Sequence, residues 1–147
     1  MTRAESAKNY FTSGYNCSQA VMLAFAPDTG ADEKFIKAVS LPMGGGIGRL
    51  RETCGGVTGA IMSMGLLFPE MNKSEMYAMV QEFARRFREK NGSYNCGELL
   101  TGAGVRAENT PEAEARTPAY YQKRPCAELV GDAAELLEEM CRERGRL

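Results

Sequence analysis

The chain of 147 residues contains no histidine and no tryptophan. Without histidine there is no Ser-His-Asp triad, no Cys-His nucleophile pair, no histidine-ligated haem and no zinc site that uses imidazole. Proton transfer would therefore fall to Glu, Asp, Lys, Tyr or Cys side chains. The chain also lacks a Cys-x-x-Cys pair, on which thioredoxin-like, zinc-ribbon and ferredoxin sites depend. Any thiol chemistry must therefore use cysteines that lie far apart in the sequence.

Long hydrophobic runs and a strong net charge are also absent. The most apolar segment, 59–68, has about half the length of a membrane span, and the polar segment 1–6 has no apolar stretch behind it. The formal net charge of −1 gives no field that would attract nucleic acid or an anionic membrane. We therefore expect a cytoplasmic protein that binds neither. Because thiols stay reduced there, the five cysteines indicate metal binding, redox exchange or packing rather than a disulfide scaffold.

Apolar residues recur mostly at helical spacing, and no segment alternates as a strand would. We predict an all-α fold, a compact helical bundle of about six to seven helices in a single domain, 1–147. The glycine- and proline-containing segment 101–123 is expected to be an irregular loop. On the helix that begins near residue 32, Phe35, Ile36 and Val39 should face the core. The predicted helices are one that ends at Gly14, followed by helices over about 17–26, 32–41, 54–67, 74–90, from 96 onward, and 125–144.

Four of the five cysteines fall at predicted helix starts. Cys17 and Cys96 each follow an asparagine suited to the N-cap, and Cys126 follows a proline, which is favoured in the first turn. Cys54 follows Thr53, which we predict as the N-cap of its helix. Free backbone N–H groups and the helix dipole favour a thiolate at such positions, which lowers the thiol pKa. These four cysteines are therefore the candidate catalytic thiols, and the candidate ligands of any metal centre.

Two of these helix starts also have a glutamine or glutamate three residues after the asparagine. Gln19 is predicted to reach back to the backbone N–H of Asn16, and Glu98 to that of Asn95, as in a capping box. Cys141 differs from the other cysteines because it lies deep in the last helix on its apolar face. We interpret Cys141 as a packing residue.

A glycine-rich loop, 44–48, precedes Arg49, Arg51 and the Cys54 helix, and it is the second candidate site. Glycine-rich backbone before a helix can bind an anion, and two arginines would help. The loop is not a Walker A motif, because Gly-Lys-Ser/Thr is missing and no strand precedes it. Gly59 and its neighbours on the next helix would allow a backbone or a cofactor to approach Cys54. The candidate ligand-binding residues are Gly44, Gly45, Gly46, Gly48, Arg49, Arg51 and Gly59.

The residues alone leave three functions open. The first is a redox protein with Cys54 as the central thiol or ligand and Cys17, Cys96 and Cys126 as its partners. It would act on a redox partner or a small molecule, either by thiol–disulfide exchange or by electron transfer through a cysteine-ligated metal or iron–sulfur centre. The second is a non-catalytic module that binds a small anion at the glycine loop. The third is a structural helical subunit of an oligomer such as a homodimer, which an exposed apolar patch would favour.

Several segments resemble the C_GCAxxG_C_C family of redox-active proteins. The similarity rests on the Asn-Cys-x-Gln-Ala-Val segment around Cys17, the Gly-Gly-Gly-Ile-Gly loop, the stretch 54–62 and the later Cys96 and Cys126, and it covers about 6–137. The resemblance implies a helical domain with redox activity through its four cysteines, together with a metal or iron–sulfur centre. It also implies a distant relationship to the helical part of split-Soret cytochromes.

The chain departs from the motif in the family's name at one place. The name spells Gly-Cys-Ala-x-x-Gly, whereas Thr53 precedes Cys54 and Gly55 follows it. Gly59, which corresponds to the closing glycine, lies one position later than the motif has it. The resemblance carries over to Cys17, Cys54, Cys96 and Cys126, with Gly59 as the closing glycine.

Overall fold

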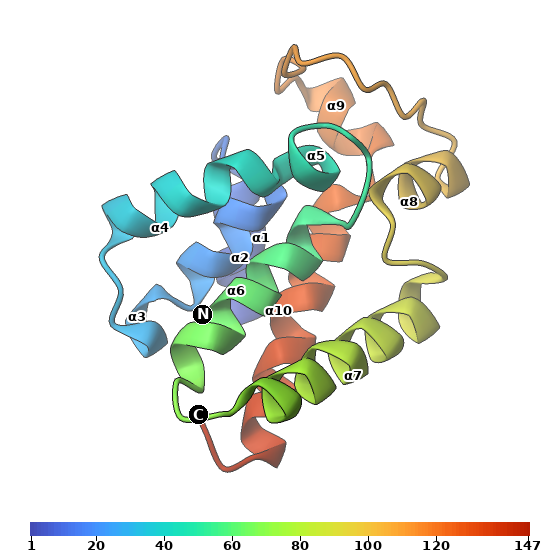
Figure 1. Ribbon diagram of the computed structural model, residues 1–147. Coiled ribbons are helices and arrows are strands. Elements are labelled where there is room, and N and C mark those ends of the chain that lie inside the picture. Colours follow the sequence, from blue (N-terminus) through green and yellow to red (C-terminus); the bar gives the residue numbers. More distant parts are fainter.

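Helices account for 68% of the chain in the computed structural model, which describes residues 1–147 (Figure 1). Seven helices have seven or more residues and no strand forms, which confirms the predicted all-α fold. No helix has the length and apolar character needed to cross a membrane. The helical segments are α1 (Arg3–Thr12), α2 (Cys17–Ala24), α3 (Ala26–Thr29), α4 (Glu33–Ser40), the 3-10 helix η1 (Leu41–Met43), α5 (Gly44–Ile47), α6 (Gly55–Leu67), α7 (Lys73–Asn91), α8 (Cys96–Gly102), α9 (Pro118–Lys123) and α10 (Cys126–Glu143).

The main core lies where α1, α2, α6 and α10 pack on one another, with α7 against α10 (Figure 1). Helix α2 is the central element, because every residue from Ser18 to Ala24 is buried. This burial explains why α2 is apolar nearly all round, as the sequence predicts. Four phenylalanines provide the largest fully buried side chains: Phe11, Phe25, Phe83 and Phe87.

Gly59 allows α6 to approach α2 very closely. A Cβ atom at Gly59 would lie only 2.6 Å from the backbone oxygen of Ser18. The sequence suggests that Gly59 makes room for either another backbone or a cofactor, and the structure shows that it makes room for the α2 backbone. The close helix pair places the start of α6, with Cys54, beside the start of α2, with Cys17.

Two predictions about the segment 17–40 are wrong. The helix that starts at Cys17 ends at Ala24 rather than near residue 26, and Pro27 lies in the first turn of α3, where its missing N–H is tolerated. Of the three residues of α4 predicted to face the core only Ile36 is buried, whereas Phe35 is 54% exposed and Val39 is 41% exposed. Helix α4 packs mainly against α2 at the edge of the molecule, so it buries a narrower stripe than predicted.

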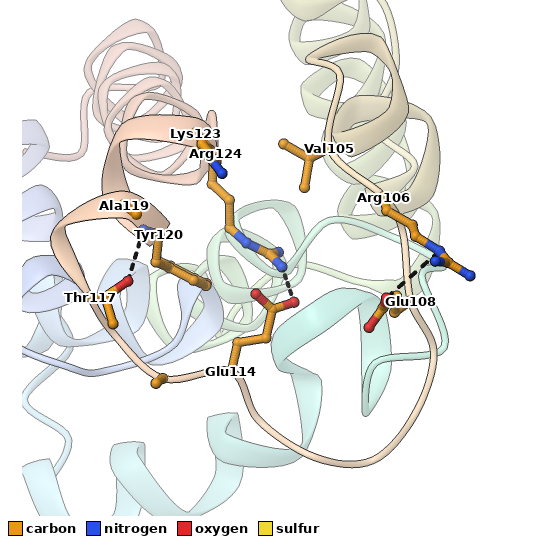
Figure 2. Close-up of a pocket in the computed structure, with 10 residues that line it drawn as sticks. Val105, Arg106, Glu108, Glu114, Thr117, Ala119, Tyr120, Lys123 and Arg124 are labelled. Atoms are coloured by element: carbon orange, nitrogen blue, oxygen red, sulfur yellow. Dashed lines mark hydrogen bonds and ion pairs between the residues drawn. The ribbon is translucent and has the colours of Figure 1, made fainter.

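The predicted irregular segment 101–123 is partly helical. Helix α8 continues to Gly102, and α9 begins at Pro118 with the Thr117 hydroxyl accepting a hydrogen bond from the Tyr120 N–H (3.2 Å; Figure 2). Threonine followed by proline is a helix-start signal, which accounts for α9. The intervening residues 103–117 form a strap without regular structure that leads from α8 to α9 (Figure 1).

Candidate functional site

The structure places the four candidate cysteines at the starts of four different helices. Cys17, Cys96 and Cys126 are the first residues of α2, α8 and α10, and Cys54 is the N-cap of α6. The prediction that Thr53 is the N-cap is wrong by one residue. Helices far apart in the sequence therefore direct their N-terminal backbone N–H groups toward a common region.

Thr53 has a different role from the one predicted. It forms an isolated antiparallel bridge with Asn95, and the next backbone N–H, that of Cys54, donates to the Tyr94 oxygen (2.8 Å). Extended backbone is needed for this pairing, so the helix begins after it. The bridge ties the start of α6 to the start of α8 and thereby fixes Cys54 relative to Cys96.

The asparagine caps hold two of the cysteines in place. Asn16 accepts a hydrogen bond from the Gln19 N–H and the Gln19 side chain accepts one from the Asn16 N–H, both at 3.0 Å, which confirms the first predicted capping box. Asn95 likewise accepts from the Glu98 N–H (2.9 Å). The second box does not close, because Ser93 lies between its members: its hydroxyl accepts from the Asn95 N–H and donates to the Glu98 carboxylate.

All four of these cysteines line one small cavity of about 20 Å³. Three leucines and a glycine complete its apolar lining: Leu99, Leu100, Leu129 and Gly55. A cavity of this size has room for about one water-sized atom. Cys141 does not take part. It is fully buried in the core on α10, as expected of a packing residue.

The Cys17 sulfur is the one sulfur of this cluster for which the thiolate is favoured. Its pKa is lowered to about 6, first by a hydrogen bond with the Cys126 thiol and then by the N–H groups of Gly45 and of Cys17 itself, with a further contribution from the charge of Arg116. Burial opposes this effect without cancelling it. Cys17 therefore has the character of a reactive thiol.

The other three thiols of the cluster stay protonated. The pKa of Cys126 is raised, because its proton is held in the hydrogen bond with Cys17 and its surroundings are buried. Burial and the adjacent Cys17 charge raise the pKa of Cys54 to about 12. Burial also raises the pKa of Cys96, although the Arg51 guanidinium partly offsets it. The expectation of a lowered pKa at every helix start is therefore wrong for these three. Burial outweighs the N–H groups at the start of α6 for Cys54 and the Arg51 charge for Cys96, and the hydrogen bond with Cys17 is the main cause for Cys126.

Four thiol donors suit a soft metal ion or an iron–sulfur cluster in their chemistry. Their placement fits such a group less well. No three Cys, Asp or Glu side chains are positioned to hold one metal ion. The cavity of about 20 Å³ between the thiols is also smaller than the inorganic core of an iron–sulfur cluster. The four side chains are packed around this cavity as free cysteines, and only Cys17 favours the negatively charged thiolate.

The glycine loop closes around its own backbone. Gly45 and Gly46 have φ values of 66° and 70°, and the N–H groups of Gly48 and Arg49 donate to Pro42 and Gly44. These N–H groups are therefore not available to an external anion. A Cβ atom at Gly46 would lie 2.6 Å from the Cys96 Cβ, so this glycine lets the loop pack directly on the cysteine cluster.

Sequence reasoning missed two arginines near the cluster, Arg116 and Arg124. Arg116 lies over the rings of Phe11 (4.4 Å to the centroid) and Tyr120 (4.9 Å), and it donates to the backbone oxygens of Phe11 and Tyr15. The Arg124 guanidinium also lies over the Tyr120 ring, 4.6 Å from its centroid. In the sequence, this packing is indicated only by the adjacent Tyr120 and Tyr121 in the mostly polar segment 101–123.

The fold and the site together define an all-helical protein with four cysteines around one small apolar cavity. A family model described as "Putative redox-active protein (C_GCAxxG_C_C)" matches residues 15–140, and the chain belongs to this family. The match confirms the resemblance seen in the sequence and contains all four cysteines of the cluster. Comparison with curated proteins and with solved structures gives no match.

Proposed function

We propose that this protein carries out thiol–disulfide exchange, with Cys17 and Cys126 as the reacting pair. The main observation is that Cys17 and Cys126 line the same small cavity, where the Cys17 thiolate and the Cys126 thiol are the favoured forms. A thiolate beside a protonated thiol is the arrangement that a dithiol reductant needs, since one sulfur attacks and the other resolves. In this proposal Cys17, rather than Cys54, is the central thiol.

The exchange can be written with its electrons and proton in balance. The Cys17 thiolate attacks one sulfur of a disulfide partner, forms a mixed disulfide and releases the partner's other sulfur as a thiolate. That thiolate takes the proton of Cys126. The Cys126 sulfur then attacks the Cys17 sulfur, forms the Cys17–Cys126 disulfide and releases the second partner sulfur as a thiolate. The pair gives up two electrons, and the partner disulfide is reduced to one thiol and one thiolate.

Replacing Cys126 with serine should trap the mixed disulfide. With oxidised glutathione, the unaltered protein should lose two free thiols and keep no glutathione, because Cys126 resolves the intermediate. Cys126→Ser should instead retain one glutathione on Cys17, which intact-mass and peptide mass spectrometry would show. Cys141→Ala, which removes a thiol outside the cluster, should behave like the unaltered protein. Glutathione retained equally by the unaltered protein, or a disulfide that excludes Cys17, would refute the assignment.

A cysteine-ligated metal or iron–sulfur centre is the second candidate function. The observation that favours it is that all four thiols line the same apolar cavity, which is a donor set without competing oxygen or nitrogen ligands. Cys17, Cys54, Cys96 and Cys126 would hold such a centre, which would supply electron transfer. The side chains would have to move from their present positions to bind it.

A further inference from the structure

A second, larger cavity of about 290 Å³ lies beside the cysteine cluster. Cys17, Cys96 and Cys126 line it, whereas Cys54 does not. The glycine loop forms another part of its wall, and the strap and Tyr120 of α9 complete it. Three of the four cysteines of the cluster are therefore shared between this cavity and the small one, and any small molecule in the larger cavity would lie against them.

The cavity is lined by far more positive than negative charge. Its lining includes four arginines, Arg49, Arg51, Arg116 and Arg124, and one carboxylate, Glu114. Glu114 pairs with Arg124 and lies 3.9 Å from Arg49. The other two arginines have no carboxylate partner and are held instead by neutral groups.

Backbone carbonyls and a thiol occupy part of the donor capacity of these two arginines. Arg51 donates to the Glu108 oxygen (2.7 Å) and to the Cys96 sulfur (3.6 Å). Arg116 donates to the Phe11 and Tyr15 oxygens. Neutral acceptors satisfy hydrogen bonds but do not balance a positive charge, so the cavity retains its excess.

Two buried guanidinium nitrogens have no acceptor at all. They are Nε of Arg49 and Nη2 of Arg51. The Arg49 side chain is only 14% exposed, so solvent does not substitute for a partner. A buried N–H of a charged group that lacks an acceptor is costly, and an anion in the cavity would relieve it.

The neighbouring surface pocket of about 480 Å³ does not share this imbalance. Glu114, Tyr120 and Arg124 line both spaces, and Figure 2 shows the lining of the surface pocket. There, Arg106 pairs with Glu108, and Arg124 points toward Glu114 (Figure 2). Its charges are thus largely paired, which singles out the inner cavity as the one suited to an anion.

We infer that the 290 Å³ cavity binds a small oxyanion with two negative charges, a phosphate or sulfate group, against Arg49, Arg51 and Arg116. Four guanidinium groups and one carboxylate leave an excess of three positive charges, and a Cys17 thiolate reduces it to two. A doubly charged oxyanion would complete the balance, and its oxygens match the planar guanidinium donors. The volume lies at the small end of ligand sites, so the anion is either free or part of a short organic molecule.

The inference can be tested by calorimetric titration of the reduced protein. The titrants are inorganic phosphate, inorganic sulfate and glycerol phosphate, and sodium chloride keeps the ionic strength constant. One site per chain is expected, and tighter binding of the ester than of phosphate would identify an organic ligand. Arg51→Gln and Arg49→Gln should each weaken binding about tenfold or more, because each removes a charge-assisted contact. Arg85→Gln, which alters an exposed arginine on α7, should leave the affinity unchanged.

Binding should persist in Cys17→Ser, so the oxyanion site can be tested separately from the redox proposal. Circular dichroism of each variant would show that the helices remain folded. The inference would be overturned if no oxyanion produced saturable heat, if chloride alone produced the same effect, or if Arg85→Gln weakened binding as much as Arg51→Gln.

Discussion

Cys17→Ser should slow the alkylation of the native protein by iodoacetamide at pH 7 by about tenfold or more, because the thiolate is the reacting form. With its pKa near 6, the Cys17 sulfur is mostly thiolate at that pH. Burial raises the pKa values of Cys54, Cys96 and Cys126 whether or not Cys17 is present, so few of these thiols are ionised at that pH. Stopped-flow or mass-spectrometric rates on the folded protein would measure the change.

The pH dependence of this rate should follow Cys17 alone. Because the thiolate forms above the thiol pKa, the rate should fall as pH drops through about 6 and should level off above about 7. Cys141→Ala should keep this profile, since Cys141 lies in the core and its own pKa is raised to about 11 by burial. A rate that titrates near the ordinary thiol pKa, or that survives Cys17→Ser, would contradict the assignment of Cys17 as the nucleophile.

Gly59→Ala should destabilise the protein by about 2 kcal/mol or more, as measured by the free energy of unfolding in urea. The added methyl group would lie 2.6 Å from the Ser18 backbone oxygen, so α2 and α6 would have to move apart. A side chain could rotate away from such a contact, but a buried helix backbone cannot. The gain in helix propensity from replacing glycine would not compensate for this separation.

Gly65→Ala on the same helix is the matched control. A Cβ atom at Gly65 meets nothing within 4 Å and the residue is exposed, so the substitution should stabilise the protein by about 0.5–1 kcal/mol through helix propensity alone. The two variants should therefore change stability in opposite directions. Stabilisation by both would show that α2 and α6 do not pack as closely as the structure has them.

The helices could be predicted because their signals are local. The apolar stripe of α7 predicted a helix over 74–90, and the structure has Lys73–Asn91. The Asn16 cap likewise fixes the start of α2 at Cys17. The predicted helix boundaries are wrong where contacts with distant segments determine them. At Thr53, for example, the bridge with Asn95 delays the start of α6 by one residue. That pairing joins residues far apart in the chain and leaves no local pattern.

The site was only partly predictable for the same reason. The positions of the four cysteines at helix starts follow from neighbouring residues, but their convergence depends on how α2, α6, α8 and α10 pack. The ordering of their pKa values depends on burial and on one thiol–thiol contact, which no spacing encodes. Arg116 and Arg124 reach the cluster only because the strap and α9 fold back over it.

The metal and thiol content of protein purified without oxygen would show whether the four cysteines act as exchanging thiols or as metal ligands. Iron, zinc and inorganic sulfide would be measured together with free thiols, before and after mild oxidation. We expect well below one metal ion per chain, five titratable thiols on unfolding and the reversible loss of two after oxidised glutathione, with Cys17 linked to Cys126. One metal ion or cluster per chain, with the four helix-start cysteines protected from alkylation, would contradict it and establish the cluster as a ligand set.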